Sequence, residues 1–358
     1  MKTKLVLLLA FLSMASTTFA QDTTAAPVLK LSAYIEAYYA YDFANPANHQ
    51  RPGFIYSHNR HNEFALNLGY LKAAYHTDRV RGNLALMTGT YAQYNLAAEP
   101  ALLQNIFEAN AGIKLSKKAG LWLDAGVMPS HIGFESAIGK DCWTLTRSLL
   151  ADNTPYYETG ARLSINSSNG KWYAAAMLLN GWQRMTRVPG IQNAILGTQL
   201  TYKPNSNVTL NWSSYWGDER PGNTVVTRFF NNFYGIFNLS SKLGLIAGLD
   251  IGTQETGNDA SSSWVTPIGI LRYSINEHWA LAGRVEYYGD QDGIIISSPS
   301  DGFETLGLSL NLDYMPVSNV SLRFEGRTLS GQGDYFFNRD GQRSSSNTFL
   351  TTALAISF

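Results

Sequence analysis

The last stretch of the chain constrains the fold more than any other. Residues 347–358 read NTFLTTALAISF, and counting back in twos separates them into two faces. One face carries Leu350, Thr352, Leu354, Ile356 and Phe358, whereas the other carries the smaller Thr351, Ala353, Ala355 and Ser357. In lipid, each unpaired backbone N–H or C=O costs several kcal/mol, so a spanning strand has to belong to a closed barrel. The pattern therefore predicts that the last strand pairs with the first, and an ordinary edge strand is the alternative.

The amino terminus has the pattern of a secretory signal peptide. Lys2 and Lys4 precede an apolar run from Leu5 to Leu12, and the small residues SMASTTFA follow. Cleavage is expected after Ala20, which makes residues 1–20 the signal peptide and residues 21–358 a single exported domain. The apolar run is too short for a spanning helix, and no later stretch approaches the roughly 18 apolar residues that one needs.

Composition narrows the class of protein further. The 27 Lys and Arg balance the 27 Asp and Glu, so the charge gives no indication of nucleic-acid binding. The 20 Tyr, 17 Phe and 8 Trp together with 31 Gly favour many strands and turns over helices. Cys142 is the only cysteine, so no intramolecular disulfide can form. The chain is expected to be all-β.

Alternating segments recur along the whole chain, and we predict about sixteen antiparallel strands in an up-and-down barrel. The expected ranges are 29–42, 62–77, 80–94, 104–116, 119–128, 156–166, 171–180, 193–203, 207–217, 226–239, 242–252, 264–275, 278–289, 303–315, 319–329 and 347–358. Short turns alternate with long polar loops between them. This alternation is typical of an outer-membrane barrel with short turns and both termini in the periplasm and long loops outside.

Some strands indicate which face meets lipid. Leu306, Leu308 and Leu310 alternate with polar residues such as Ser309 and Asn311. Since side chains cannot fill the interior of sixteen strands, the polar parity should face a water-filled lumen. The charges expected on this inner face are Glu36, Glu108, Lys114, Asp124, Glu158, Arg162, Asp250, Arg284, Glu286, Asp313, Arg323, Glu325 and Arg327. They could act on solutes, or they could simply pair with cross-strand neighbours.

The third outside loop, near residues 128–155, is the longest, and its sequence resembles a known family. The runs GVMPSHIGFESAIGKD and TRSLLADNTPYYETGARL are similar to the signature region of the OmpL-like β-barrel porins of Gram-negative bacteria. The terminal Phe358 likewise resembles the carboxyl-terminal signal of outer-membrane barrels. The resemblance implies a channel whose third loop folds inward, and it says little about the solute.

Charges on this loop are the best candidates for a pore constriction. Residues 141–152 place Cys142, Leu145 and Leu149 at the spacing of a short helix. The candidate constriction residues are Glu135, Lys140, Asp141 and Arg147, because opposed charges at a narrow point act strongly on passing ions.

Catalytic, metal and cofactor sites are not indicated by the sequence. His49, His58 and His61 lie near one another but lack paired carboxylates at a metal-binding spacing. No G-x-S-x-G nucleophile motif occurs. We therefore expect no catalytic residues, no metal and no cofactor, and an outer-membrane hydrolase is the last of the alternatives.

The function expected from these patterns is passive diffusion of small hydrophilic solutes through an outer-membrane porin. The alternatives are a solute-selective channel and a structural or interaction barrel of an envelope complex. The expected partners are outer-membrane lipid and small solutes, without nucleic acid, and a homo-oligomer is left open. The solute, the ion selectivity and the open or plugged state of the pore do not follow from the sequence.

Overall fold

The computed structural model describes residues 27–117, 119–219, 226–257, 260–300 and 302–358. The expected signal peptide, residues 1–20, lies outside the described residues. Within them, no helix is long and apolar enough to cross a membrane.

Sixteen antiparallel strands form one closed barrel. In chain order they are β1 (Val28–Asp42), β2 (Phe64–His76), β3 (Val80–Thr88), β4 (Ile106–Ser116), β5 (Leu121–Pro129), β6 (Tyr157–Asn166), β7 (Trp172–Leu179), β8 (Ile195–Asn205), β9 (Val208–Asp218), β10 (Thr227–Asn238), β11 (Leu243–Gly257), β12 (Ala260–Ser274), β13 (Trp279–Asp290), β14 (Phe303–Val317), β15 (Val320–Gly331) and β18 (Ser346–Ser357). The expected fold class is confirmed. A separate small hairpin pairs β16 (Phe336–Phe337) with β17 (Arg343–Ser344).

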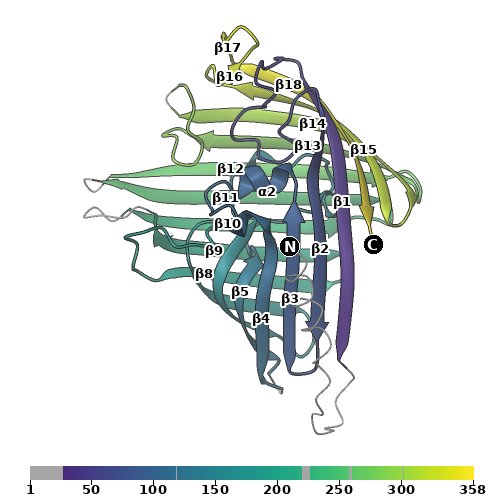
Figure 1. Ribbon diagram of the computed structural model, residues 1–358, viewed down its shortest axis with the longest axis vertical. Helices are drawn as coiled ribbons and strands as arrows, with labels where there is room; N and C mark the ends of the chain where they lie inside the picture. The colour runs from purple at the N-terminus through teal and green to yellow at the C-terminus, as the bar shows by residue number, and fades with distance from the viewer. Residues whose placement is uncertain (1–26, 118, 220–225, 258–259, 301) are drawn as a thin grey trace, which may run out of the picture.

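The barrel closes where the last strand meets the first. β18 pairs antiparallel with β1 in a register that runs from Tyr34 opposite Ser357 to Asp42 opposite Phe349. Phe358 continues this ladder, because its backbone N–H donates to the carbonyl of Ala33 at 2.9 Å. In Figure 1 the purple β1 lies beside the yellow β18, and strands on the near and far walls cross because they are tilted. The pairing of the last strand with the first, expected from the sequence, is confirmed.

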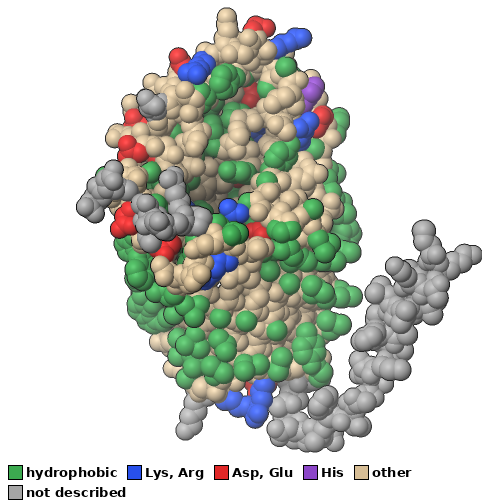
Figure 2. Space-filling model, turned by 60° about the vertical axis from the view of Figure 1, so that its left-hand side comes forward, with side chains coloured by type: hydrophobic (Ala, Val, Ile, Leu, Met, Phe, Trp, Pro, Cys, Tyr) green, Lys and Arg blue, Asp and Glu red, His purple; other side chains and the backbone are tan. Residues whose placement is uncertain are grey.

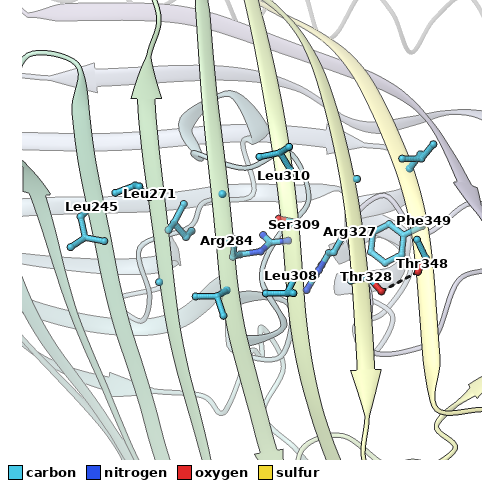
Figure 3. A pocket seen from close by; sticks show the side chains of 16 residues that line it. Leu245, Leu271, Arg284, Leu308, Ser309, Leu310, Arg327, Thr328, Thr348 and Phe349 are labelled. Atoms are coloured by element: carbon cyan, nitrogen blue, oxygen red, sulfur yellow. Dashed lines mark hydrogen bonds between the residues drawn. The ribbon is translucent and has the colours of Figure 1, made fainter.

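The two faces of the wall differ in chemistry. On β14, Leu306, Leu308 and Leu310 are exposed on the outside, whereas Thr305 and Asn311 are buried inside. Figure 2 shows hydrophobic side chains gathered over the lower wall and charged side chains mainly toward the two ends. A shallow apolar groove of about 730 Å³ on this outer surface is bordered by leucines of neighbouring strands (Figure 3). The outer face thus suits lipid.

The outer connections are mostly long, as expected. We number those used below L1 (43–63), L2 (89–105), L3 (130–156), L4 (180–194), L7 (291–300) and L8 (332–345). One prediction is wrong here: β11 and β12 run on to Gly257 and Ala260, so their connection comprises only positions 258–259, which lie outside the described residues. The residues assigned to a polar loop there extend the hairpin instead.

Two further details differ from the sequence-based expectation. The third strand ends at Thr88 rather than near Tyr94, because Gly89 adopts a positive φ of 122° and the chain continues into α2 (Thr90–Asn95). In β2, the register shifts where Glu36 lies opposite Leu68 and Ala37 opposite Leu66. This β-bulge reverses the parity of the strand beyond it.

The seam between β1 and β18 can be tested with a cross-strand disulfide. In a Cys142→Ser background, the pair Ala37→Cys and Leu354→Cys should oxidise readily, because these residues lie directly opposite each other. The control pair Ala37→Cys and Leu350→Cys should not, since Leu350 lies opposite Tyr41, about 13 Å farther along the strand. Reductant-sensitive mobility of the denatured chain in electrophoresis measures the bond. Equal cross-linking of both pairs would contradict the register.

Candidate channel constriction

L3 runs through the interior of the barrel, and its first part follows the wall formed by β6 and β9. His131 lies with Nδ1 2.7 Å from Glu158 Oε2 and with Nε2 2.8 Å from the carbonyl of Ser214. Both partners accept hydrogen bonds, so a doubly protonated ring satisfies them together. Burial lowers the pKa of His131, but the charge and hydrogen bond of Glu158 outweigh it, and the pKa is raised. His131 therefore fixes the start of the loop.

The loop continues across β10 and β11. Gly133 donates its backbone N–H to Asn232 Oδ1 at 3.1 Å, and Asn232 donates from Nδ2 to Asp250 Oδ1 at 2.6 Å. Phe134 packs against the cluster that contains Ile246 of β11 and Ile268 of β12. Polar and apolar contacts together hold this part of L3 against the barrel.

Residues 139–149 of L3 lie along β13, β14 and β15, where wall arginines donate to loop carbonyls. Arg323 Nη1 donates to the carbonyl of Gly139 at 2.6 Å, and Arg327 Nη1 donates to that of Arg147 at 2.9 Å. Both wall arginines are buried. Charge-assisted hydrogen bonds of this kind are roughly twice as strong as neutral ones, so they anchor the loop firmly.

Wall carboxylates complete the attachment by accepting from loop N–H groups. Glu325 Oε2 accepts from the backbone N–H of Thr146 at 2.5 Å, and Glu286 Oε2 accepts from that of Leu149 at 2.7 Å. Because wall side chains supply both donors and acceptors to its backbone, the segment 142–148 holds its position although it forms no helix or strand.

The same wall charges are paired with one another. Arg284 lies 2.9 Å from Glu325 and 3.2 Å from Glu286, and Arg327 lies 2.5 Å from Glu286. In Figure 3, Arg284 and Arg327 extend toward each other behind β14. Removing one partner of such a buried network would leave an uncompensated charge, which typically costs about 3–5 kcal/mol. The network is a rigid platform for L3.

Arg147 lies inside the loop, fully buried. Its guanidinium donates to three carbonyls of L3 itself, those of Ser136 at 2.6 Å, Leu145 at 2.6 Å and Ala137 at 3.0 Å. The sequence suggested a charge facing the passage, whereas these contacts make Arg147 the centre around which the loop folds.

Glu135 has a similar internal position. Its Oε2 accepts from the backbone N–H of Ser148 at 3.1 Å and also from the Ser148 hydroxyl. Ser148 in turn caps the short helix α3 (Leu149–Asp152) by accepting from the N–H of Ala151 at 3.1 Å. The helix expected over 141–152 is wrong over most of its length, because the wall residues take up the backbone groups that a helix would use.

Lys140 and Asp141 lie apart from Glu135 and Arg147, at the deepest part of the loop. Lys140 Nζ donates to the hydroxyl of Ser357, near the end of β18, at 2.8 Å. Asp141 is exposed. The four candidate constriction residues thus form two groups, one inside L3 and one at its inner tip, and their effect on permeation stays a prediction.

L1 also folds inward and meets β1. Glu36 Oε1 lies 2.9 Å from His58 Nε2 and accepts from Asn67 Nδ2 at 2.7 Å, while Tyr34 donates to Oε2 at 2.7 Å. All four side chains are buried. The carboxylate therefore ties L1 to β1 and β2.

L1 and L3 meet at Asp152. Asp152 Oδ1 accepts from the hydroxyls of Ser57 at 3.1 Å and Tyr156 at 3.2 Å. Burial raises the pKa of Asp152 to about 7. The two loops form one packed body inside the barrel.

The other expected inner charges lie on the same face of the wall. Buried ones are Glu36, Glu108, Asp124, Glu158, Asp250, Arg284, Glu286, Asp313, Arg323, Glu325 and Arg327, whereas Lys114 and Arg162 are partly exposed. Many are paired: Arg162 lies 3.4 Å from Asp124 and Arg323 lies 2.6 Å from Asp313. Their role as pore charges stays a prediction.

Sequence reasoning missed two inner cations, Lys72 and Arg81. Lys72 pairs with Glu108, and Arg81 lies 2.5 Å from Asp124. Lys72 was missed because the bulge in β2 reverses the parity of the strand. The polar Asn67 inside an otherwise apolar run was the available signal for that bulge.

Within the described parts of the chain, no group of three or more His, Cys, Asp or Glu side chains is arranged to hold a metal ion. His58 of the histidine group is instead buried against Glu36.

Sequence and structural comparisons agree with this architecture. Residues 28–358 match the family described as "Putative beta-barrel porin-2, OmpL-like". No curated protein matches the sequence.

Several solved structures share the fold. The anion-selective porin from Comamonas acidovorans is similar with a TM-score of 0.62 and 10% identity, over 93% of this chain and 100% of that one. OmpT of Vibrio cholerae is similar with a TM-score of 0.60 and 8% identity, over 95% of this chain and 99% of that one. Salmonella typhi OmpF, solved in a complex with daunomycin, has a TM-score of 0.56 and 10% identity, over 92% of this chain and 97% of that one. At these identities the likeness concerns the fold.

The structural role of Arg147 can be tested by Arg147→Met. Three loop carbonyls lose their donor, which should cost about 3 kcal/mol or more and accelerate amide exchange in L3 by roughly 100-fold. Exchange in the barrel strands should not change. Arg339→Met is the matched control, because Arg339 is exposed in L8. Hydrogen exchange followed by mass spectrometry measures both, and unchanged L3 protection would refute this role of Arg147.

Proposed function

Because the chain belongs to the OmpL-like β-barrel porin family, we propose that it lets small hydrophilic solutes diffuse passively across the outer membrane, and that L3 narrows the passage. The observation that carries the proposal is the attachment of L3 to β13, β14 and β15 by side chains such as Arg323 and Glu325. A loop held in this way narrows the lumen and leaves the strand pairing of the wall intact. The proposed activity involves no catalytic step.

The proposed path follows the side of the lumen that L3 leaves free. An outer cavity of about 280 Å³ is lined by residues of L2, L4 and β10, among them Asn95, Trp182 and Arg228. An inner cavity of about 300 Å³ is lined by Lys72 and Glu108 together with L3. Residues 152–154 of L3 line the outer cavity, and the residues that follow directly, 155–157, line the inner one. We propose that solutes pass from one to the other at this segment.

Charges along the path are nearly balanced. The outer cavity has three acids, Asp152, Asp218 and Glu219, and two bases, Arg184 and Arg228. The inner cavity has Glu108 and Glu135 against Lys72. Because acids exceed bases by only one in each cavity, we expect a weak preference for cations and passage of neutral polar solutes. A strongly solute-selective channel would be the alternative.

The family and the fold indicate the bacterial outer membrane, and we further propose that both termini lie in the periplasm. The short turns, the start of β1 and the end of β18 lie at one end of the barrel, which supports this orientation. On intact cells, Ser345→Cys in L8 should react with an impermeant thiol reagent, whereas Asn205→Cys at the end of β8, beside the β8–β9 turn, should not. The reverse labelling pattern would invert the topology.

A homo-oligomer is a further part of the proposal. Vibrio cholerae OmpT has been solved in a trimer form, and this chain shares its fold. The molecular mass of the purified barrel in detergent measures the oligomeric state, and a monomeric mass would refute this part alone.

Channel activity is tested by shortening L3. Deletion of residues 136–150 removes the loop from the platform and should raise single-channel conductance in planar bilayers by roughly twofold or more. The barrel should still form, because its strands lie outside the cut. Deletion of residues 338–342 at the tip of L8 is the control and should leave conductance unchanged.

The outcomes distinguish the alternatives. A folded wild-type protein and a folded L3 deletion that both fail to conduct would indicate a structural or interaction barrel. Equal conductance of the wild-type protein and the L3 deletion would support a channel whose narrowest point lies outside L3.

A further inference from the structure

The outer mouth contains a second cavity, which lies apart from the proposed path. It measures about 360 Å³ and lies among L1, L7 and L8. Asp42, at the end of β1, and Arg51 of L1 border it, and Phe54, Tyr335 and Phe336 provide aromatic walls. None of these residues lines either cavity of the proposed path.

Arg51 is a buried cation that lacks an acidic partner. Only 4% of the residue is exposed, and no carboxylate oxygen of the described part of the chain lies within 4.0 Å of its nitrogens. Nη1 donates to the carbonyl of His58 at 2.9 Å, whereas Nε and Nη2 have no hydrogen-bond partner among the residues that the structure describes. The guanidinium lies 3.5 Å from the centre of the Phe349 ring. Such unsatisfied donors are costly when buried, so a ligand that supplies an acceptor would be bound favourably here.

Asp42 is an equally buried anion on the same cavity, with 1% of the residue exposed. Its Oδ1 accepts from the N–H of Ala44 at 2.9 Å and from Asn347 Nδ2 at 2.8 Å. Its Oδ2 has no hydrogen-bond partner within the described ranges of the chain. Asp42 is close enough to Arg51 to raise the pKa of the guanidinium, although burial lowers that pKa overall to about 10. The two opposite charges thus face one cavity without pairing directly.

We propose that this mouth cavity binds a small zwitterion, a free amino acid or short peptide, with its carboxylate on Arg51 and its ammonium on Asp42. A guanidinium recognises a carboxylate through two parallel hydrogen bonds, and an ammonium supplies the donor that Asp42 Oδ2 lacks. A ligand with one charge would leave the opposite protein group unsatisfied. The aromatic residues of the cavity provide contact for an apolar side chain.

Binding requires a small adjustment of the loop. The unpaired atoms of Arg51 and Asp42 are themselves covered, so a ligand reaches them only after residues 46–54 of L1 shift slightly. These residues form a loop rather than part of the barrel ladder, so the shift does not disturb strand pairing.

Three ligands with one apolar body test the proposal on the purified, folded barrel in detergent. L-Phenylalanine carries both charges, 3-phenylpropionate lacks the ammonium and 2-phenylethylamine lacks the carboxylate. Titration calorimetry, or saturation-transfer NMR for weak binding, should give L-phenylalanine at least a tenfold lower Kd than either analogue. Equal affinity for all three, or no binding of L-phenylalanine, would overturn the proposal.

Variants of Arg51 and Asp42 test which charged group of the ligand each residue binds. Arg51→Gln and Asp42→Asn should each weaken L-phenylalanine binding at least tenfold, and Asp42→Asn should retain 3-phenylpropionate binding. If Arg51→Gln fails to fold, Arg51→Lys keeps a donor for the His58 carbonyl but loses the planar fork, so it should also weaken binding. Arg339→Gln and Asp340→Asn, both exposed in L8, are the matched controls. Undiminished binding in folded Arg51 and Asp42 variants would refute the site.

This binding does not depend on conduction. A barrel that conducts but does not bind L-phenylalanine refutes the mouth site and leaves the proposed function intact. A barrel that binds but does not conduct refutes the channel and leaves the site.

Discussion

The pairing of every backbone N–H and C=O in the wall is the constraint on which the rest of the structure depends. Lipid offers no hydrogen bonds, so a strand with an open edge cannot remain in the hydrocarbon region. β18 therefore has to meet β1, and the ladder from Tyr34 to Asp42 removes the last edge. Closure fixes which side of each strand faces inward. The chemistry of the interior follows from that choice.

Closure creates an interior too wide for side chains of the wall to fill, and the inward loops occupy much of it. The wall charges of β13, β14 and β15 are satisfied partly by one another and partly by the backbone of L3. Charges that would otherwise line open water thus act as fixed attachment points. Buried ion pairs contribute little net stability, but their fixed geometry specifies one position for the loop.

Much of the fold could be predicted from the sequence, because alternation in a strand follows directly from its geometry. Leu306, Leu308 and Leu310 predicted the lipid face of β14, and the terminal strand predicted closure. The parity rule failed in β2, where one bulged residue near Asn67 transfers Lys72 to the inside. It also could not place Arg147, since a loop has no fixed period. Only tertiary contacts distinguish a charge at the loop surface from one buried among its carbonyls.

The attachment of L3 also orders the steps by which the protein can assemble. L3 belongs to the first half of the chain, whereas the strands that receive it, β13 to β15, come from the last third. The hydrogen bond between Asp42 and Asn347 likewise joins residues 305 positions apart. Such distant partners meet late, because the intervening chain has to be arranged first. The interior can therefore take its final form only after the whole chain has been synthesised. L3 in its native position is thus evidence that the strands of the wall have all been assembled.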